Sequence, residues 1–209
     1  MTCALIDIGI GNLHSAEKAF VRMAEGDQAI HVTADPEVVR RAERVVLPGD
    51  GAFPACRRAL AGVPGLEEAV LEAVRAGKPL FGICVGMQLL ASVGHEFETV
   101  EGLGLIPGEV VRIAPADAGL KVPHMGWNDL VVTGSHPVLD GVMTGDHAYF
   151  VHGWQFRVAD PAHSLAHVDY GGEVTAIVGR DNVVATQFHP EKSQATGLRI
   201  IRNFLEWRP

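Results

Sequence analysis

The sequence of 209 residues contains only three cysteines, Cys3, Cys56 and Cys84. Their number is odd and no Cys-x-x-Cys pair occurs, which argues against both a disulfide framework and a cysteine-ligated zinc site. The ten histidines are scattered and form no His-Glu-x-x-His pattern. We therefore expect no metal centre.

Long apolar runs and basic clusters are also missing. No stretch approaches the roughly 18 uncharged apolar residues that cross a bilayer, and Asp7 interrupts the N-terminal apolar segment where a signal peptide would continue. The 25 acidic residues outnumber the 17 lysines and arginines, so the formal net charge is −8. We predict a cytoplasmic protein that binds neither membranes nor nucleic acids.

A dinucleotide fingerprint is incomplete. Gly9-Ile10-Gly11 follows the first predicted strand, but the chain has His14 where a third glycine is needed, and the next strand lacks an acidic ribose ligand. We therefore expect no dinucleotide, and the sequence indicates no other cofactor.

The hydrophobic fraction of 47% predicts a well-filled core, and we expect residues 1–209 to form a single domain. Strands and helices alternate up to Ser92, which predicts an α/β fold with a mostly parallel central sheet flanked by helices. Short strands separated by turn residues follow, so additional antiparallel strands are expected in the C-terminal half. The expected elements are helices 15–24, 65–74 and 195–207, a helix starting at Asp35-Pro36, and strands 4–8, 29–32, 45–47, 79–81, 105–113, 130–132, 149–152, 165–168, 175–178 and 183–186.

Gly82-Ile83-Cys84-Val85-Gly86 lies between a predicted strand and a predicted helix at 87–91. The Gly-x-Cys-x-Gly spacing matches the geometry of a nucleophile elbow, in which flanking glycines allow a sharp turn that exposes the nucleophile. A helix N-terminus next to the thiol would favour the thiolate. Cys84 is therefore a candidate nucleophile, although a buried cysteine between two packing glycines is the alternative from this stretch alone.

Two further segments supply what such a nucleophile needs. Residues 48–53 form a glycine-containing loop at the end of a strand, whose backbone N–H groups could hold an oxyanion, although an ordinary turn explains this loop as well. In the second segment, Pro190 favours an extended backbone at His189. The Glu191 carboxylate can then reach the imidazole and fix its tautomer, which gives the order nucleophile, base and orienting acid.

Residues 48–53, 82–88 and 187–191 resemble, in this order and spacing, the three signatures of class I glutamine amidotransferases. The resemblance spans the chain and implies a flavodoxin-like fold. It implies that Cys84 attacks the side-chain amide of glutamine, that His189 protonates the departing ammonia, and that Glu191 orients the histidine. A γ-glutamyl thioester would then be hydrolysed to glutamate.

The same resemblance assigns further roles. The oxyanion would be held by backbone N–H groups of Gly51 and Val85. Residues implied to bind glutamine are Gly49, Gln88, Glu96, Gly153 and Trp154.

Residues 6–15, 122–128 and 149–152 are similar to the glutaminase subunits of imidazole glycerol phosphate synthases. The chemistry of 122–128 alone predicts a partly buried polar-aromatic turn. The resemblance implies a heterodimer with a (β/α)8 cyclase subunit, which would use the ammonia to form imidazole glycerol phosphate and AICAR in histidine biosynthesis. The residues implied to contact this partner are His124, Met125, Gly126, Trp127 and Asn128.

The chain departs from the family pattern at three places. Ile8 replaces a common tyrosine, and Gly153-Trp154 replaces a hydroxylated residue followed by tyrosine, so backbone groups could make the hydrogen bonds there. Asp50 replaces a frequently apolar residue in the loop of residues 48–53, called the oxyanion loop below. Because a carboxylate facing the site would oppose the developing negative charge, we predict that Asp50 points to solvent or to the partner.

Three other functions remain open from the sequence. The first is the glutaminase subunit of another class I amidotransferase, for pyridoxal phosphate, aminodeoxychorismate or anthranilate formation; residues 123–128 argue against it. The second is a cysteine hydrolase or peptidase built on the same elbow. The third is a regulatory scaffold with a silent triad, which the three intact catalytic positions disfavour.

Overall fold

The centre of the computed structural model is one eight-stranded sheet, and the structure describes residues 1–11 and 13–209. The strand order is β2-β1-β3-β4-β14-β13-β12-β9; the first five strands are parallel, and the last three pair in antiparallel fashion. The strands are β1 (Thr2–Ile6), β2 (Ala29–Thr33), β3 (Arg44–Gly49), β4 (Leu80–Cys84), β9 (Val131–Val132), β12 (Ser164–Asp169), β13 (Glu173–Arg180) and β14 (Val183–Thr186).

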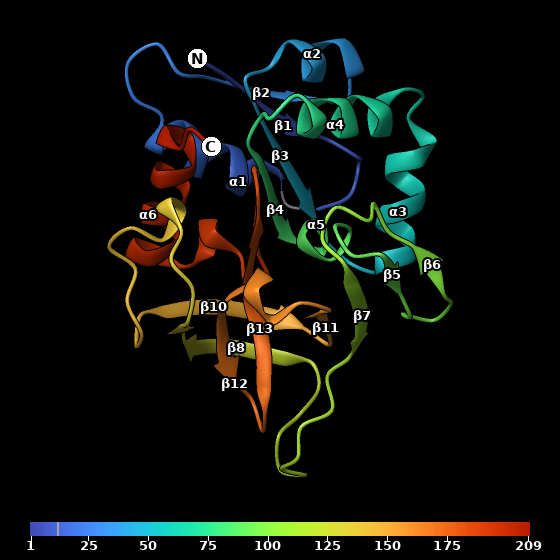
Figure 1. The fold of residues 1–209 in the computed structure, drawn as a ribbon, viewed down its shortest axis with the longest axis vertical. Coiled ribbons are helices and arrows are strands. Elements are labelled where there is room, and N and C mark those ends of the chain that lie inside the picture. The colour runs from blue at the N-terminus through green and yellow to red at the C-terminus, as the bar shows by residue number, and fades with distance from the viewer. Residues whose placement is uncertain (12) are drawn as a thin grey trace.

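Helices cover this sheet, as the alternating pattern predicts. Helices α1 and α6 pack together, while α2, α3 and α4 form a second group on the other side of the strands (Figure 1). The helices are α1 (Leu13–Met23), α2 (Pro36–Arg41), α3 (Phe53–Gly62), α4 (Leu66–Arg75), α5 (Val85–Gln88) and α6 (Gln194–Glu206). The predicted α/β fold with antiparallel strands in the C-terminal half is confirmed.

Two smaller sheets lie beyond the C-terminal ends of β3 and β4 (Figure 1). One is the antiparallel pair of β8 (His124–Asp129) and β10 (His147–His152). The other has the order β11-β7-β5-β6, with β11 (Trp154–Val158), β7 (Gly108–Arg112), β5 (Val93–Gly94) and β6 (Val100–Glu101). Short 3-10 helices complete the chain at Pro137–Leu139, Pro161–His163 and Pro190–Lys192.

A cluster of three fully buried aromatic rings joins α1, β4 and α6. Phe81 lies 6.2 Å from Phe20 and 5.1 Å from Phe204, measured between ring centroids. Buried aromatic pairs of this kind contribute both apolar burial and favourable ring contacts. They fix the first and last helices against the strand that carries Cys84.

The local signals at helix ends perform as predicted. Asp35 caps α2, since its carboxylate accepts a hydrogen bond from the Glu37 N–H, and Pro36 occupies the first turn. Gly77 follows α4 with a positive φ of 78°, which suits the residue after a helix C-cap.

Helix α3 is missed by the sequence predictions, although Phe53, Cys56 and Leu60 are buried at helical spacing. Two expectations are wrong. Residues 124–129 form strand β8 instead of a turn, because pairing with β10 outweighs the turn preference of Gly126 and Asn128. The helix after Cys84 ends at Gln88 and does not continue to residue 91.

Asn12, part of the segment 6–15 used in the sequence comparison, lies outside the described residues. Among the described helices, none has the length and apolar character needed to cross a membrane.

Candidate active site

Cys84 ends β4 in a strained backbone conformation. Its φ of 56° and ψ of −113° are unusual for a residue with a side chain, and strain of this kind persists only where surrounding structure enforces it. Here the enforcement is close packing: a side chain on Gly86 would overlap the Leu47 carbonyl oxygen of β3, and one on Gly82 would press on Gly86. The two glycines of the predicted elbow are therefore required by the turn.

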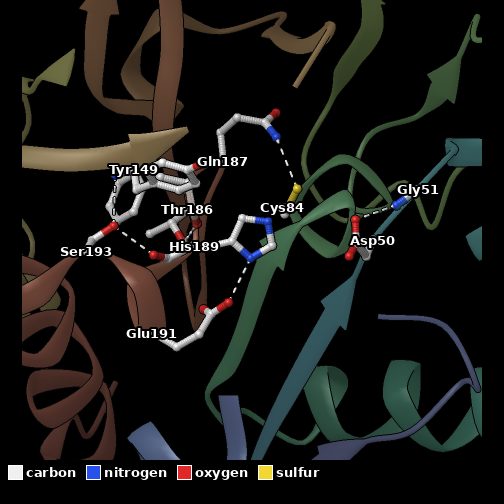
Figure 2. A network of polar contacts seen from close by, with 10 residues as sticks. Asp50, Gly51, Cys84, Tyr149, Thr186, Gln187, His189, Glu191 and Ser193 are labelled. Atoms are coloured by element: carbon white, nitrogen blue, oxygen red, sulfur yellow. Dashed lines mark hydrogen bonds and ion pairs between the residues drawn. The ribbon is translucent and has the colours of Figure 1, made fainter. Parts of the chain in front are cut away.

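The imidazole of His189 lies between Glu191 and Cys84 (Figure 2). Its Nδ1 is 2.8 Å from Oε1 of Glu191, and the two side chains are only 6% and 3% exposed. Its Nε2 is buried, forms no hydrogen bond within the described residues, and is turned toward Cys84. The structure therefore brings the three predicted catalytic residues together, in the orientation that an acid, a base and a nucleophile require.

Electrostatics at His189 favour the charged ring. Burial lowers the pKa of His189, but its interactions with the nearby Cys84 and with the hydrogen-bonded Glu191 carboxylate outweigh this effect and raise its pKa above the ordinary value. A carboxylate on Nδ1 stabilises the imidazolium that forms when Nε2 accepts a proton.

The backbone of the His189 segment is anchored to strand β10. The His189 N–H donates to the Tyr149 carbonyl at 3.3 Å, and the Ser193 hydroxyl donates to the His189 carbonyl at 2.7 Å (Figure 2). Ser193 in turn accepts the Tyr149 N–H at 3.0 Å. No local signal predicts a role for Ser193 or Tyr149 in the site, because the Ser193–Tyr149 contact joins residues 44 positions apart.

In the oxyanion loop, both the carbonyl and the N–H of the Asp50–Gly51 peptide form hydrogen bonds. The Cys56 thiol donates to the Asp50 carbonyl at 3.0 Å. The Gly51 N–H donates to the Asp50 carboxylate at 2.8 Å (Figure 2). Asp50 is half-buried and lines a small cavity together with Gly49, His189 and Glu191, so its predicted orientation toward solvent or a partner stays a prediction. The carboxylate folds back because an N–H donor lies one residue away.

This contact bears on the predicted oxyanion hole. The N–H of Gly51 is already paired with a carboxylate, so it can reach an oxyanion only if Asp50 releases it. The Val85–Gly86 segment packs directly on Gly49, where an added side chain would overlap the Gly86 nitrogen. Gly49 and Val85 therefore lie side by side at the strand ends, next to Cys84.

The residues predicted to bind glutamine occupy different surroundings. The Gln88 amide donates to the Trp154 carbonyl at 3.1 Å and to the Gln187 side chain at 3.0 Å; Gln187 itself lies 3.8 Å from the Cys84 sulphur. Gln88 and the Gly153-Trp154 backbone are thus brought near the nucleophile. The Glu96 carboxylate instead accepts the Phe53 N–H at 2.7 Å, where it supports the start of α3 after the oxyanion loop.

The strand alternation of β8 divides the predicted partner contacts. Met125 and Trp127 point outward and are 63% and 47% exposed, whereas His124 is buried and Asn128 half-buried. Gly126 lies between the outward residues. Only part of the predicted set is therefore available to a partner in this conformation.

Comparison with known proteins agrees with this geometry. The family model described as "Glutamine amidotransferase class-I" matches residues 4–207. The chain belongs to the class I glutamine amidotransferases.

Two curated members of this family are similar over their whole length. "Imidazole glycerol phosphate synthase subunit HisH" of Ruegeria pomeroyi is 61% identical over 212 residues, and the protein of the same name from Cereibacter sphaeroides is 63% identical. Each alignment covers 100% of both chains. The predicted narrower resemblance is confirmed.

Two solved structures share the fold at low sequence identity. A structure described as "Crystal structure of glutamine amidotransferase" has a TM-score of 0.72, 23% identity, and 97% coverage of both chains. "Structure of PurLQS from Thermotoga maritima" has a TM-score of 0.73 and 19% identity, covering 98% of this chain and 97% of its own.

The contact between Glu191 and His189 gives a first prediction. In a Glu191→Gln variant the side-chain amide can donate to Nδ1, which would leave the proton on Nε2 and block proton acceptance from Cys84. We expect glutamine hydrolysis to fall on the order of 10²- to 10⁴-fold, measured as glutamate release. Glu67→Gln is the control and should retain activity, because it alters a half-buried carboxylate on α4 that pairs with Arg57 of α3. Near-normal turnover by Glu191→Gln would contradict the orienting role.

The Asp50 contact gives a second prediction. Asp50→Ala frees the Gly51 N–H and removes a negative charge beside the site, so glutamine hydrolysis by the isolated chain should rise by roughly tenfold. Asp50→Asn keeps a side-chain oxygen acceptor and should stay closer to the unaltered protein. Loss of most activity in Asp50→Ala would show instead that the carboxylate assists the reaction.

Proposed function

We propose that this class I glutamine amidotransferase hydrolyses glutamine to glutamate and ammonia, and that it supplies the ammonia to the cyclase subunit of an imidazole glycerol phosphate synthase in histidine biosynthesis. The observation that carries the proposal is the buried Nε2 of His189, unpaired among the described residues and turned toward Cys84, with Nδ1 held by Glu191. The similarity to HisH subunits over the full length supports the choice of synthase.

The proposed reaction has two halves. Nε2 of His189 takes the thiol proton while the Cys84 sulphur attacks the side-chain amide carbon of glutamine. Collapse of the tetrahedral oxyanion breaks the C–N bond, and His189 passes the proton to the leaving nitrogen, which departs as ammonia. Nε2 of His189 then activates a water molecule, which attacks the thioester, releases glutamate and restores the thiol.

The pocket assignments remain part of the proposal. Gln88 is hydrogen-bonded to Gln187, and Gln187 contacts the Cys84 sulphur, so Gln88 lies near the proposed nucleophile. Its carboxamide can both donate hydrogen bonds to the substrate and accept them from it. Gly49, Gly153 and Trp154 are proposed to contact glutamine through their backbones. Glu96 is retained as a contributor to the pocket, although its present contact supports the Phe53 N–H.

A separate partner follows from the fate of the product. Ammonia released into water at neutral pH becomes ammonium, which has no lone pair to attack an electrophile. Direct transfer to a second protein avoids that loss. The exposed Met125 and Trp127 of β8 form an apolar surface suited to such a partner, proposed to be the (β/α)8 cyclase subunit of a heterodimer.

Residues 1–209 are proposed to act as one glutamine amidotransferase domain, supported by the family match to residues 4–207. The cytoplasmic location expected from the sequence stays a prediction. A glutaminase subunit for pyridoxal phosphate, aminodeoxychorismate or anthranilate formation is the alternative, but the full-length relatives of 61% and 63% identity carry the HisH name.

The decisive experiment is Cys84→Ala in complex with the cyclase subunit. Without the thiol no thioester can form, so glutamine-dependent synthase turnover should disappear while turnover with added ammonium persists. The unaltered complex should use both nitrogen sources. Survival of glutamine-dependent turnover in Cys84→Ala would overturn the mechanism, and absence of stimulation by the cyclase in the unaltered protein would overturn the coupling.

The exposed residues of β8 give a separate prediction for the partner. Trp127→Ala removes a large aromatic contact, and truncation of such residues at interfaces weakens binding by about 2 kcal/mol or more. We therefore expect the dissociation constant of the complex, measured by calorimetry, to rise at least about 30-fold. Val32→Ala on the far edge strand β2, also an exposed apolar residue, is the control. Equal affinity for Trp127→Ala and unaltered protein would exclude this face as the docking surface.

A further inference from the structure

A chain of hydrogen bonds links strand β8 to the candidate glutamine pocket through two buried histidines. The Asn128 amide lies 3.3 Å from Nε2 of His124, and Nδ1 of His124 lies 3.1 Å from Nε2 of His152. Nδ1 of His152 lies 2.8 Å from the Trp154 carbonyl oxygen. His152 is 6% exposed and has no role in the proposed mechanism.

The chemistry of the groups at the ends fixes the direction of this chain. A carbonyl oxygen only accepts, so Nδ1 of His152 carries the proton and, in the neutral ring, Nε2 of His152 accepts. Nδ1 of His124 must therefore donate to it, which leaves Nε2 of His124 as the acceptor for the Asn128 amide. Every ring nitrogen of the pair then has a partner of the correct kind.

The surroundings keep both rings neutral and in place. His124 stacks on Tyr170 at 4.0 Å and on Phe150 at 4.8 Å between ring centroids. Burial lowers the pKa of His124 to about 4. Burial likewise lowers the pKa of His152 to about 4, against the opposing effect of its hydrogen bond to the Trp154 carbonyl. Near pH 7 both rings are therefore neutral, and each has the one donor and one acceptor nitrogen that this chain of hydrogen bonds requires.

The chain ends on an atom that the candidate pocket shares. The Trp154 carbonyl accepts from His152 and also from the Gln88 amide, which donates as well to Gln187 beside Cys84. His152 therefore fixes the carbonyl that holds the Gln88 carboxamide. At the other end, His124 and Asn128 alternate along β8 with the outward Met125 and Trp127.

We propose that His152 is a positioning residue that sets the Trp154 carbonyl and the Gln88 carboxamide for glutamine binding, and that His124 and Asn128 tie this setting to the partner-facing strand. The proposal rests on the proposed glutaminase function. A displacement of β8 on partner binding would move His124, and through it the carbonyl that orients Gln88.

Paired amide substitutions separate this role from simple packing. In His152→Asn the amide nitrogen occupies about the place of Nδ1 and can still donate to the Trp154 carbonyl, whereas in His152→Gln it occupies about the place of Nε2. We expect the KM for glutamine to rise about tenfold in His152→Gln and His152→Phe, and to stay within about threefold of normal in His152→Asn. The kcat should change less than KM in all three.

The link to strand β8 is tested with His124→Phe, which preserves an aromatic ring for stacking but removes both nitrogens. The factor by which the cyclase subunit increases the rate of glutamine hydrolysis should fall about tenfold in this variant relative to the unaltered protein. The measurement is made at saturating cyclase, so that weakened association does not contribute. The control is His136→Phe, at a half-buried histidine that meets Trp207 edge-on and takes no part in this hydrogen-bond chain; it should change neither quantity.

Three results would overturn the proposal. They are an unchanged KM in His152→Phe, equal losses in His152→Asn and His152→Gln, and full stimulation of His124→Phe by the cyclase. Thermal unfolding of each variant identifies a folding defect, and turnover of the complexes with added ammonium should be unaffected throughout. An unaltered protein that does not hydrolyse glutamine, with or without cyclase, would overturn the proposed function itself, which is distinguishable from a failure confined to the variants.

Discussion

The strained backbone of Cys84 is the constraint on which the rest of the site depends. A residue with positive φ at the end of β4 turns its side chain out of the sheet, and the chain can turn there only because Gly86 passes against the carbonyl of Leu47. This close approach also places the Val85–Gly86 peptide beside Gly49 of β3. One steric requirement therefore positions the nucleophile and brings the oxyanion loop next to it.

The second half of the site is tied to the small sheet of β8 and β10. Strand β10 holds the His189 segment through Tyr149 and Ser193, and its last residue, His152, contacts the Trp154 carbonyl. Strand β8 pairs with β10 along its length and presents Trp127 outward. The proposed partner surface is thus connected by backbone pairing and side-chain contacts to both the base and the pocket.

Asp50 places a negative charge in the candidate oxyanion loop. A carboxylate at position 50 would be unfavourable beside an oxyanion, and the structure places it on the N–H of Gly51. The Cys56 thiol holds the opposite side of the same peptide. The loop therefore has a defined arrangement in which one of its candidate donors is occupied.

The sequence by itself determined the elements with strong local signals, and it predicted the three residues proposed as the triad. Gly82 and Gly86 indicate a sharp turn because few other residues fit one. Asp35-Pro36 indicates a helix start because the Asp35 carboxylate accepts a free N–H of the first turn and Pro36 has no N–H to leave unpaired. The spacing of His189 and Glu191 predicted their contact, but only His189 is extended as expected, whereas Glu191 lies in the 3-10 helix Pro190–Lys192. Only the tertiary structure decided that 124–129 is a strand, that Asp50 folds back on Gly51, and that His124, His152 and Gln88 form one connected set. Those features depend on pairing between segments distant in the chain, or on which of several nearby donors a side chain reaches, and neither is fixed by local sequence.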